Sequence, residues 1–182
     1  MKHPMAQYGE GGVLDTRVAG ERALNDIERA IAAQRSDVVI ALDFEGVRAV
    51  TVPFADACLG KLLTGRAAGF YEHHSIVLLD ANEDVRETIG LALRYRNLVA
   101  LVLGHGGPPE LLGADAILEQ TMNAALELQD FSVIDLASRL SLSPQAANNR
   151  LRHLLRSGAL ERDRVNPRTG GREFRYRVPV AA

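Results

Sequence analysis

The sequence predicts a small α/β unit over residues 12–106, followed over residues 109–182 by helices and a C-terminal strand pair. Two observations support this division. In the first part, short apolar runs alternate with segments of helical periodicity, which is typical of a sheet covered by helices. In the second part, short amphipathic segments precede two arginine-rich, strand-like segments.

Charge is divided unevenly between the two parts of the chain. Residues 131–182 hold ten arginines and four acidic residues, a net charge of +6, whereas residues 1–130 hold eleven basic and nineteen acidic residues, a net charge of −8. The overall net charge of −2 conceals this division. A basic segment can release counterions from a phosphate backbone, so the charge favours nucleic-acid binding by the C-terminal part.

Composition is that of a soluble globular protein. The 182 residues are 47% hydrophobic and 24% charged, which excludes a disordered chain and leaves room for two small domains. No apolar run reaches the roughly 20 residues that a membrane span requires, and residues 1–12 lack the apolar core of a signal peptide. Cys58 is the only cysteine, which excludes an internal disulfide and a cysteine-rich zinc site. We expect a cytoplasmic protein without membrane contact.

Three apolar runs predict the main strands of the first unit. They are residues 37–42 (DVVIAL), 75–80 (SIVLLD) and 98–103 (LVALVL), and residues 12–17 form a shorter β-like run after a polar leader. Runs without polar alternation predict strands that are buried on both faces, as in a sheet covered by helices.

Helical periodicity separates these runs. Residues 21–34 are amphipathic, residues 54–63 follow Pro53, which is favoured in a first helical turn, and residues 83–96 follow Asn82, a helix-capping residue type. The order β-α-β-α-β-α-β predicts an α/β sandwich with a partly parallel sheet.

Residues 43–56 (DFEGVRAVTVPFAD) carry a more specific signal. A buried strand ending in Asp-Phe-x-Gly-Val, then a turn and a helix, resembles the signature region of STAS domains, the fold of anti-sigma-factor antagonists. The Phe-Ala-Asp after the turn is similar to the bacterial STAS-like family, which often accompanies helix-turn-helix modules. The resemblance covers roughly residues 12–106 and implies a sensor or protein-interaction domain.

This resemblance departs from the family pattern where regulatory phosphorylation occurs. Antagonists that act as phospho-switches present serine at the helix start, whereas Val52 and Pro53 stand at those positions here. Only Thr51 could supply a hydroxyl at this helix N-terminus. We interpret Thr51 as a helix cap, with a phospho-switch as the alternative.

The sequence contains no recognisable catalytic or cofactor-binding motif. It lacks both the P-loop pattern and the dinucleotide-binding glycine pattern. Residues 104–107 (GHGG) could hold an anion on backbone N–H groups, but a glycine-rich loop before two prolines is typical of a domain end. His73 and His74 would point to opposite faces of a strand, which disfavours a shared metal ion. We predict a protein that is not an enzyme and has no cofactor or metal.

The second unit begins with three helices. Residues 114–128 are amphipathic, and Ser132 starts the next helix with Asp135 three residues later, a capping-box pattern. After a short turn, Ser143 caps the third helix and Pro144 occupies its first position.

The third helix, residues 144–157, has an apolar face and a polar face. Its polar face contains amides, arginines and a histidine, namely Gln145, Asn149, Arg152, His153 and Arg156. Amides can bind adenine edges, arginine binds guanine or phosphate, and the start of a recognition helix normally meets the bases. We therefore assign Gln145, Ala146 and Asn149 to base edges, and Arg152 and His153 to groove edges and phosphates. A solvated helix face is the alternative interpretation.

An arginine-rich hairpin follows this helix. Residues 160–163 and 173–178 predict paired strands, and Gly158 ends the preceding helix. The turn between the strands carries Arg164, Arg168 and Arg172, and arginines on such a loop typically reach the minor groove or its phosphates.

Residues 140–162 (LSLSPQAANNRLRHLLRSGALER) resemble the winged-helix signature of MarR/ArsR-type regulators. In that signature, Leu-Ser-x-Ser-Pro opens the recognition helix and a Gly-x-Leu-x-Arg pattern leads into the wing. The resemblance covers about residues 115–180. It implies a winged helix-turn-helix domain with DNA contacts at Gln145, Ala146 and Asn149.

These observations lead to the hypothesis of a transcriptional regulator with a STAS-like sensor or interaction domain and a winged helix that binds double-stranded DNA. We expect a homodimer, because one winged helix offers a limited contact area and regulators usually pair two half-sites. The first domain would dimerise, bind a regulatory protein or sense a signal. One alternative is a partner-switching module whose winged helix docks protein instead of DNA. Another is a small-molecule-binding domain whose ligand controls DNA affinity.

Overall fold

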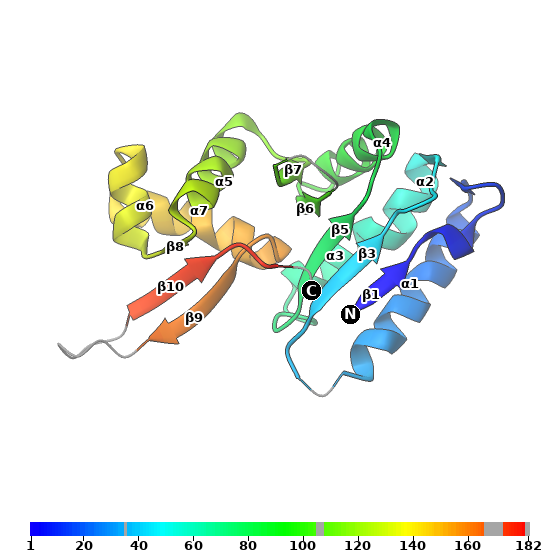
Figure 1. Ribbon diagram of the computed structural model, residues 1–182, viewed down its shortest axis with the longest axis horizontal. Coiled ribbons are helices and arrows are strands. Elements are labelled where there is room, and N and C mark those ends of the chain that lie inside the picture. The colour runs from blue at the N-terminus through cyan, green and yellow to red at the C-terminus, as the bar shows by residue number, and fades with distance from the viewer. Residues whose placement is uncertain (35, 105–107, 166–172, 181–182) are drawn as a thin grey trace.

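The computed structural model describes residues 1–34, 36–104, 108–165 and 173–180, which form a mixed α/β protein (Figure 1). A five-stranded sheet with the order β1-β3-β5-β6-β7 organises the N-terminal part. The strands are β1 Lys2–Pro4, β3 Val39–Asp43, β5 Ser75–Leu79, β6 Ala100–Leu103 and β7 Glu110–Leu112. The first four are parallel to one another, and β7 is antiparallel to β6. The prediction of a partly parallel sheet is confirmed.

Two strands of this sheet are not predicted by the sequence pattern. The segment expected to be a polar leader contains β1, whose residues pair with residues 41–43 of β3. Met5 and Tyr8, which follow β1, are buried in the core. Strand β7 lies in the part assigned from the sequence to the second unit, yet it completes the sheet beside β6. Both strands have only three residues, which is too short for a recognisable pattern.

One face of the sheet is covered by helices. They are α1 Arg17–Ala32, α4 Glu83–Arg94 and a continuous helical stretch of α2 Val52–Ala55, a π-helical turn Asp56–Gly60 and α3 Lys61–Ala67. A two-stranded parallel sheet of β2 (Val13–Leu14) and β4 (Ala49–Val50) lies beside them. The predicted cap of α4 is confirmed, because Asn82 Oδ1 accepts a hydrogen bond of 3.0 Å from Val85 N. Helix α1 begins four residues earlier than predicted, where Thr16 Oγ1 accepts from Ala19 N.

Side chains alternate between two cores along the strands. Ile40, Leu42 and Leu78 point into the core formed with the helices. Ala41 and Val77 point the other way, into a second core that continues into the C-terminal part of the chain. The strands are therefore covered on both faces, as the apolar runs predicted, but the second cover is the C-terminal part and not a further helical layer.

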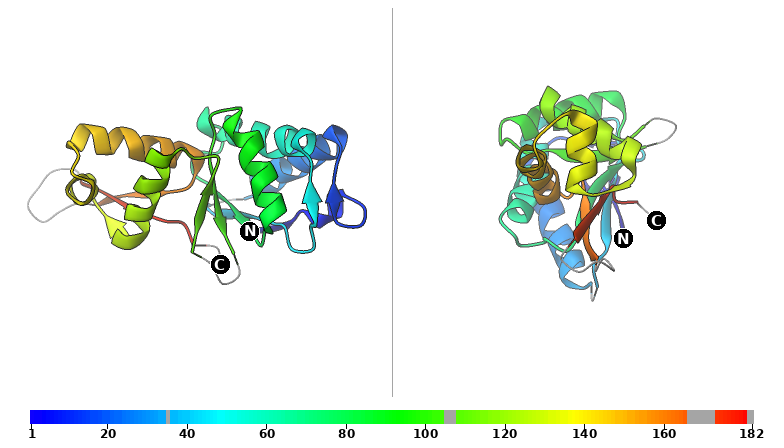
Figure 2. Two further views of the ribbon diagram at one scale, coloured as in Figure 1. Left: turned by 90° about the horizontal axis from the view of Figure 1, so that it is seen from above. Right: turned by 90° about the vertical axis from the view of Figure 1, so that its left-hand side faces the viewer.

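Where the structure describes it, the C-terminal part consists of three helices and a small sheet. Its elements are α5 Ala116–Leu128, β8 Asp130–Phe131, α6 Val133–Leu140, α7 Pro144–Ser157, β9 Glu161–Val165 and β10 Glu173–Arg177. The strands form an antiparallel sheet with the order β8-β10-β9. In Figure 1 these elements lie to the left of the large sheet, and α1 lies to its right. The left view of Figure 2 shows that the chain is elongated along this direction, and the right view looks along it from the C-terminal part.

The predicted capping box of α6 is confirmed. Ser132 N donates to Asp135 Oδ2 over 2.7 Å, and Asp135 N donates to Ser132 Oγ over 3.3 Å. No helix within the described ranges is long and apolar enough to cross a membrane.

Candidate nucleic-acid interface

Helix α7 begins and ends at the residues that the sequence indicates. Ser143 Oγ accepts a hydrogen bond of 3.2 Å from Ala146 N, and Pro144 occupies the first turn, where a missing N–H leaves no intrahelical bond unmade. Gly158 ends the helix in the left-handed conformation, with φ of 83°. Ala147 and Leu151 are fully buried, and they fix which side of the helix faces outward.

The outward face of α7 carries the residues predicted to meet DNA. Gln145, Asn149, Arg152 and Arg156 are exposed there, and Ala146 and His153 lie half-buried at its margins. Gln145 Nε2 donates to Asn149 Oδ1 over 3.2 Å, so the two amides lie one turn apart on one stripe. The structure thus brings the predicted residues of α7 onto one surface.

The predicted hairpin arginines are only partly described. Arg164 lies exposed on β9, opposite Phe174 of β10. Arg168 and Arg172 lie outside the described residues. The paired strands are confirmed, although β9 begins one residue later and ends two residues later than the sequence predicts.

Several arginines of the basic C-terminal part are held in ion pairs. Arg139 Nε lies 2.9 Å from Glu127 Oε2, Arg175 Nε lies 2.6 Å from Asp130 Oδ1, and Arg177 Nε lies 3.0 Å from Glu161 Oε2. By contrast, Arg152, Arg156 and Arg164 form no ion pair with another described residue. The net charge from the sequence therefore overstates the cations available, and among the described residues those without an ion pair concentrate on α7 and β9.

Two grooves flank α7. The first, of about 800 Å³, separates α7 from the turn between α4 and β6 and from the start of α5. Asn149, Arg150 and His153 line it on the α7 side. The second, of about 720 Å³, lies between α7, β9 and the chain that follows α3. Its lining combines five arginines, Arg152 and Arg156 among them, with four carboxylates, so most of its positive charge is offset.

The C-terminal end of α7 is held by a buried arginine of α3. Arg66 is 5% exposed, and its Nη1 donates to the carbonyls of Leu155 and Arg156 over 2.6 and 2.7 Å. Its Nε donates to the His74 carbonyl over 2.8 Å. Burial lowers the pKa of Arg66 to about 10, so it remains a cation at neutral pH. A cation at this end also complements the negative end of the helix dipole.

The turn after α7 is fitted closely against the large sheet. Ser75 Oγ, at the start of β5, donates to Glu161 Oε1 over 3.1 Å. A Cβ atom added at Gly158 would lie 2.7 Å from Arg66 Nε and 3.1 Å from Ile76 N. These contacts fix α7 relative to the N-terminal part. The sequence gives no signal for them, since Arg66 lies 89 residues from Leu155.

Thr51 is a helix cap, as predicted. Its Oγ1 accepts from Phe54 N over 3.4 Å and donates to the Asp15 carbonyl over 2.6 Å. Both hydrogen bonds hold the start of α2 to the preceding chain, which accounts for a hydroxyl at this position without phosphorylation.

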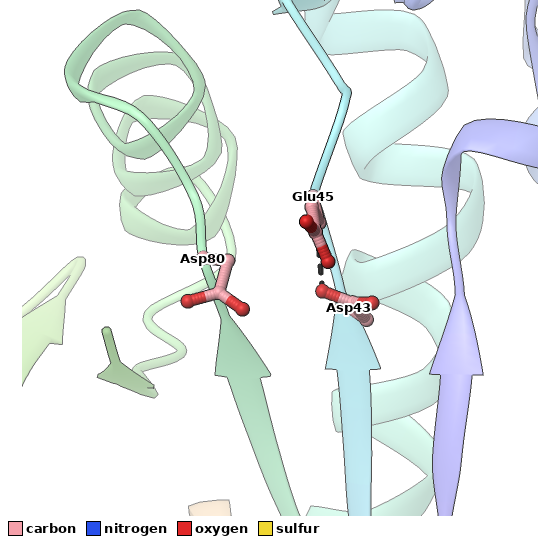
Figure 3. A group of neighbouring side chains, drawn as sticks. All are labelled: Asp43, Glu45 and Asp80. Atoms are coloured by element: carbon pink, nitrogen blue, oxygen red, sulfur yellow. Dashed lines mark hydrogen bonds between the residues drawn. The ribbon is translucent and has the colours of Figure 1, made fainter. Parts of the chain in front are cut away.

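Three carboxylates gather at the carboxyl ends of β3 and β5 (Figure 3). Oxygen atoms of Asp43, Glu45 and Asp80 lie within 4.8 Å of one another, a spacing that a cation could bridge. Asp43 already lies 3.0 Å from Lys2 Nζ and accepts a hydrogen bond from Glu45 N. The negative charge of Asp43 is therefore offset by Lys2 within the chain.

Cys58 and His74 have structural roles in the fold. Cys58 is fully buried, and burial raises the pKa of its thiol to about 12, so it is not a reactive thiolate. His74 Nδ1 accepts from Val38 N over 3.2 Å.

Comparison with known proteins gives no family assignment. No protein-family model matches the chain, and no curated protein matches it significantly. One solved structure with significant similarity is a possible transcriptional regulator from Methanosarcina mazei Go1. It is 14% identical, with 44% of this chain and 75% of that chain covered and a TM-score of 0.34. A similarity this distant carries no argument about function.

Proposed function

We propose that the protein is a DNA-binding transcriptional regulator. In this proposal the C-terminal part is a winged helix, with α7 as recognition helix and the β9–β10 hairpin as wing. The N-terminal part is a STAS-like sensor or interaction domain. The protein would act in the cytoplasm, without enzymatic activity.

One observation carries the proposal, namely the composition of the outward face of α7. Two hydrogen-bonded amides in its first half are followed by Arg152 and Arg156, which form no ion pair with another described residue. Amides hydrogen-bond base edges in the major groove, and arginines bind guanine or phosphate. The opposite face is buried, so α7 can enter a groove only with this face forward.

The proposal includes a homodimer on double-stranded DNA. A single recognition helix reads few base pairs, and paired half-sites about one helical turn apart supply the remaining contacts. The STAS-like domain would provide the dimer contact or the site for a regulatory protein.

The test first needs a preferred DNA duplex, which is obtained by selecting the fragments of the source genome that the protein binds. Two substitutions in the full chain then test the proposed function. Asn149→Ala should weaken binding to that duplex by roughly 1–3 kcal/mol and leave non-specific binding nearly unchanged. Arg164→Ala should weaken binding to both kinds of duplex and reduce the salt dependence, as expected for a lost phosphate contact.

The opposite result would favour a protein-docking module. If neither substitution changed DNA affinity while both disrupted a complex with a protein partner, the outward face of α7 would be a protein-interaction surface. A full-length chain that binds no duplex DNA at low salt would exclude the proposed function.

A further inference from the structure

We propose that the N-terminal α/β part itself contacts DNA, through Arg94, the last residue of α4, and Asn97, in the turn between α4 and β6. This inference rests on the proposed function, since it takes α7 as the recognition helix. It adds a DNA contact outside the winged helix. The contact surface is the α4-side wall of the 800 Å³ groove beside α7.

The α4–β6 turn is a rigid support for these side chains. Asn97 has a left-handed backbone with φ of 54°, and its N–H donates to the Arg94 carbonyl over 3.1 Å. Leu98 N donates to the Leu93 carbonyl over 3.0 Å, and both leucines are buried. Buried residues therefore hold both ends of the turn, and Arg94 and Asn97 between them are exposed.

Arg94 is an available cation. The neighbouring Arg96 is paired with Asp56, but Arg94 forms no ion pair with any residue that the structure describes. Among the described residues that line this groove, the only carboxylate belongs to Asp115. Its Oδ1 accepts from Leu118 N over 2.8 Å, as the cap of α5. The groove therefore presents Arg94 on one wall and Arg150 and His153 on the other.

The position of this groove matches the path of a DNA strand. When a recognition helix lies in the major groove, phosphate backbones pass along both of its sides. Asn149 belongs to the base-reading stripe and also lines this groove, so the groove opens directly beside the bases. A backbone on this side of α7 would pass between α7 and the α4–β6 turn. There the Arg94 guanidinium would bind a phosphate and the Asn97 amide would donate to one.

Salt-dependent binding by the full chain tests the inference. Arg94→Ala should weaken binding to specific and non-specific duplexes by a similar factor, on the order of tenfold. It should also reduce the log–log salt slope by about 0.9, the value for one phosphate contact. Asn97→Gly, which tolerates the left-handed backbone, should weaken binding less and leave the slope unchanged.

Arg22→Ala is the matched control, because Arg22 is an exposed arginine on α1 that does not line the groove. Arg22→Ala changes the net charge by the same amount as Arg94→Ala and should leave the affinity for duplex DNA and the log–log salt slope unchanged. If Arg94→Ala behaved like Arg22→Ala, the inference would be overturned while the proposed function stood. The inference would also fail if Arg94→Ala weakened binding to the preferred duplex alone and left the log–log salt slope unchanged. It would fail as well if Arg94→Ala abolished the binding of inorganic phosphate but left the affinity for duplex DNA unchanged. A wild-type chain that binds no duplex would overturn both proposals.

Discussion

Arg66 is a buried cation whose described hydrogen bonds go to backbone carbonyls. Removing a charge from water is costly unless it is compensated, and here the carbonyl oxygens at the end of α7 supply the compensation. The bond to Arg156 satisfies a carbonyl of the last helical turn, and the Leu155 carbonyl accepts from Gly158 N over 3.1 Å as well as from Arg66. One side chain thus stabilises the end of α7 and attaches it to α3.

A substitution at Gly158 tests how closely the end of α7 packs against Arg66. Gly158→Ala should lower the free energy of unfolding by more than Gly46→Ala, as measured by urea denaturation. Both glycines have left-handed backbones, with φ of 83° and 77°, so both variants carry the conformational penalty of about 1–2 kcal/mol. Only at Gly158 would the new Cβ lie against Arg66, because nothing lies within 4 Å of it at Gly46. An equal decrease in the free energy of unfolding in the two variants would show that Arg66 can move away from the new Cβ atom without destabilising the protein.

At the scale of the element, the capping box of α6 makes stability depend on pH. The hydrogen bond from the backbone N–H of Ser132 holds the pKa of Asp135 below its ordinary value of 3.8. A carboxyl whose pKa is lowered on folding stabilises the folded state above its ordinary pKa, and that contribution disappears as the pH falls through the lowered value.

Asp135→Asn should therefore lower the free energy of unfolding at pH 7 by roughly 0.5 kcal/mol, since it keeps an acceptor but removes the charge. The difference from wild type should narrow as the pH falls below 3.8. Urea denaturation between pH 7 and pH 2 measures this. Ser143→Ala is the control, because the uncharged Ser143 hydroxyl caps α7, and its loss should lower the free energy of unfolding by a similar amount at every pH. A difference between Asp135→Asn and wild type that stays constant with pH would contradict the prediction.

Local elements could be predicted from the sequence better than long-range contacts. Helix α7 is predictable because Ser143, Pro144 and Gly158 mark its ends and its apolar residues recur with helical spacing. Strands β3, β5 and β6 are predictable because they are apolar runs. Strands β1 and β7 are not, because only their pairing with distant neighbours identifies them.

The candidate site divides in the same way. The residues on the outward face of α7 could be predicted, because they belong to one helix and follow from its periodicity. Arg94 and Asn97 beside it could not, because their place depends on how the N-terminal and C-terminal parts pack. The ion pairs of Arg139, Arg175 and Arg177 could not be predicted either, because a count of charged residues does not show which of them form pairs.

At the scale of the whole molecule, the second core joins the N-terminal and C-terminal parts. Val77 and Leu101 of the large sheet belong to one apolar cluster with Met122 of α5 and with Leu154 and Leu160 around the end of α7. Separating the parts would expose both sides of this cluster to water.

An isolated segment of residues 109–182 should therefore unfold at a lower urea concentration than the same elements in the full chain. It should also bind an apolar dye that the full chain does not bind. Circular dichroism and dye fluorescence measure the two effects. An isolated segment as resistant to urea as the full chain would show that the second core contributes little to C-terminal stability.

The attachment of α7 to Arg66 also affects what partial chains can do. The ribosome completes Arg66 before the carbonyls of Leu155 and Arg156, which follow 89 and 90 residues later, so the donor is in place when its acceptors emerge. A product that stops before Leu155 lacks the end of α7, and a proteolytic fragment without α3 lacks its donor. Under the proposed function, the first fragment lacks part of its recognition helix, and the second carries a recognition helix whose end has lost its attachment to α3. Both fragments should therefore bind operator DNA more weakly than the full chain does.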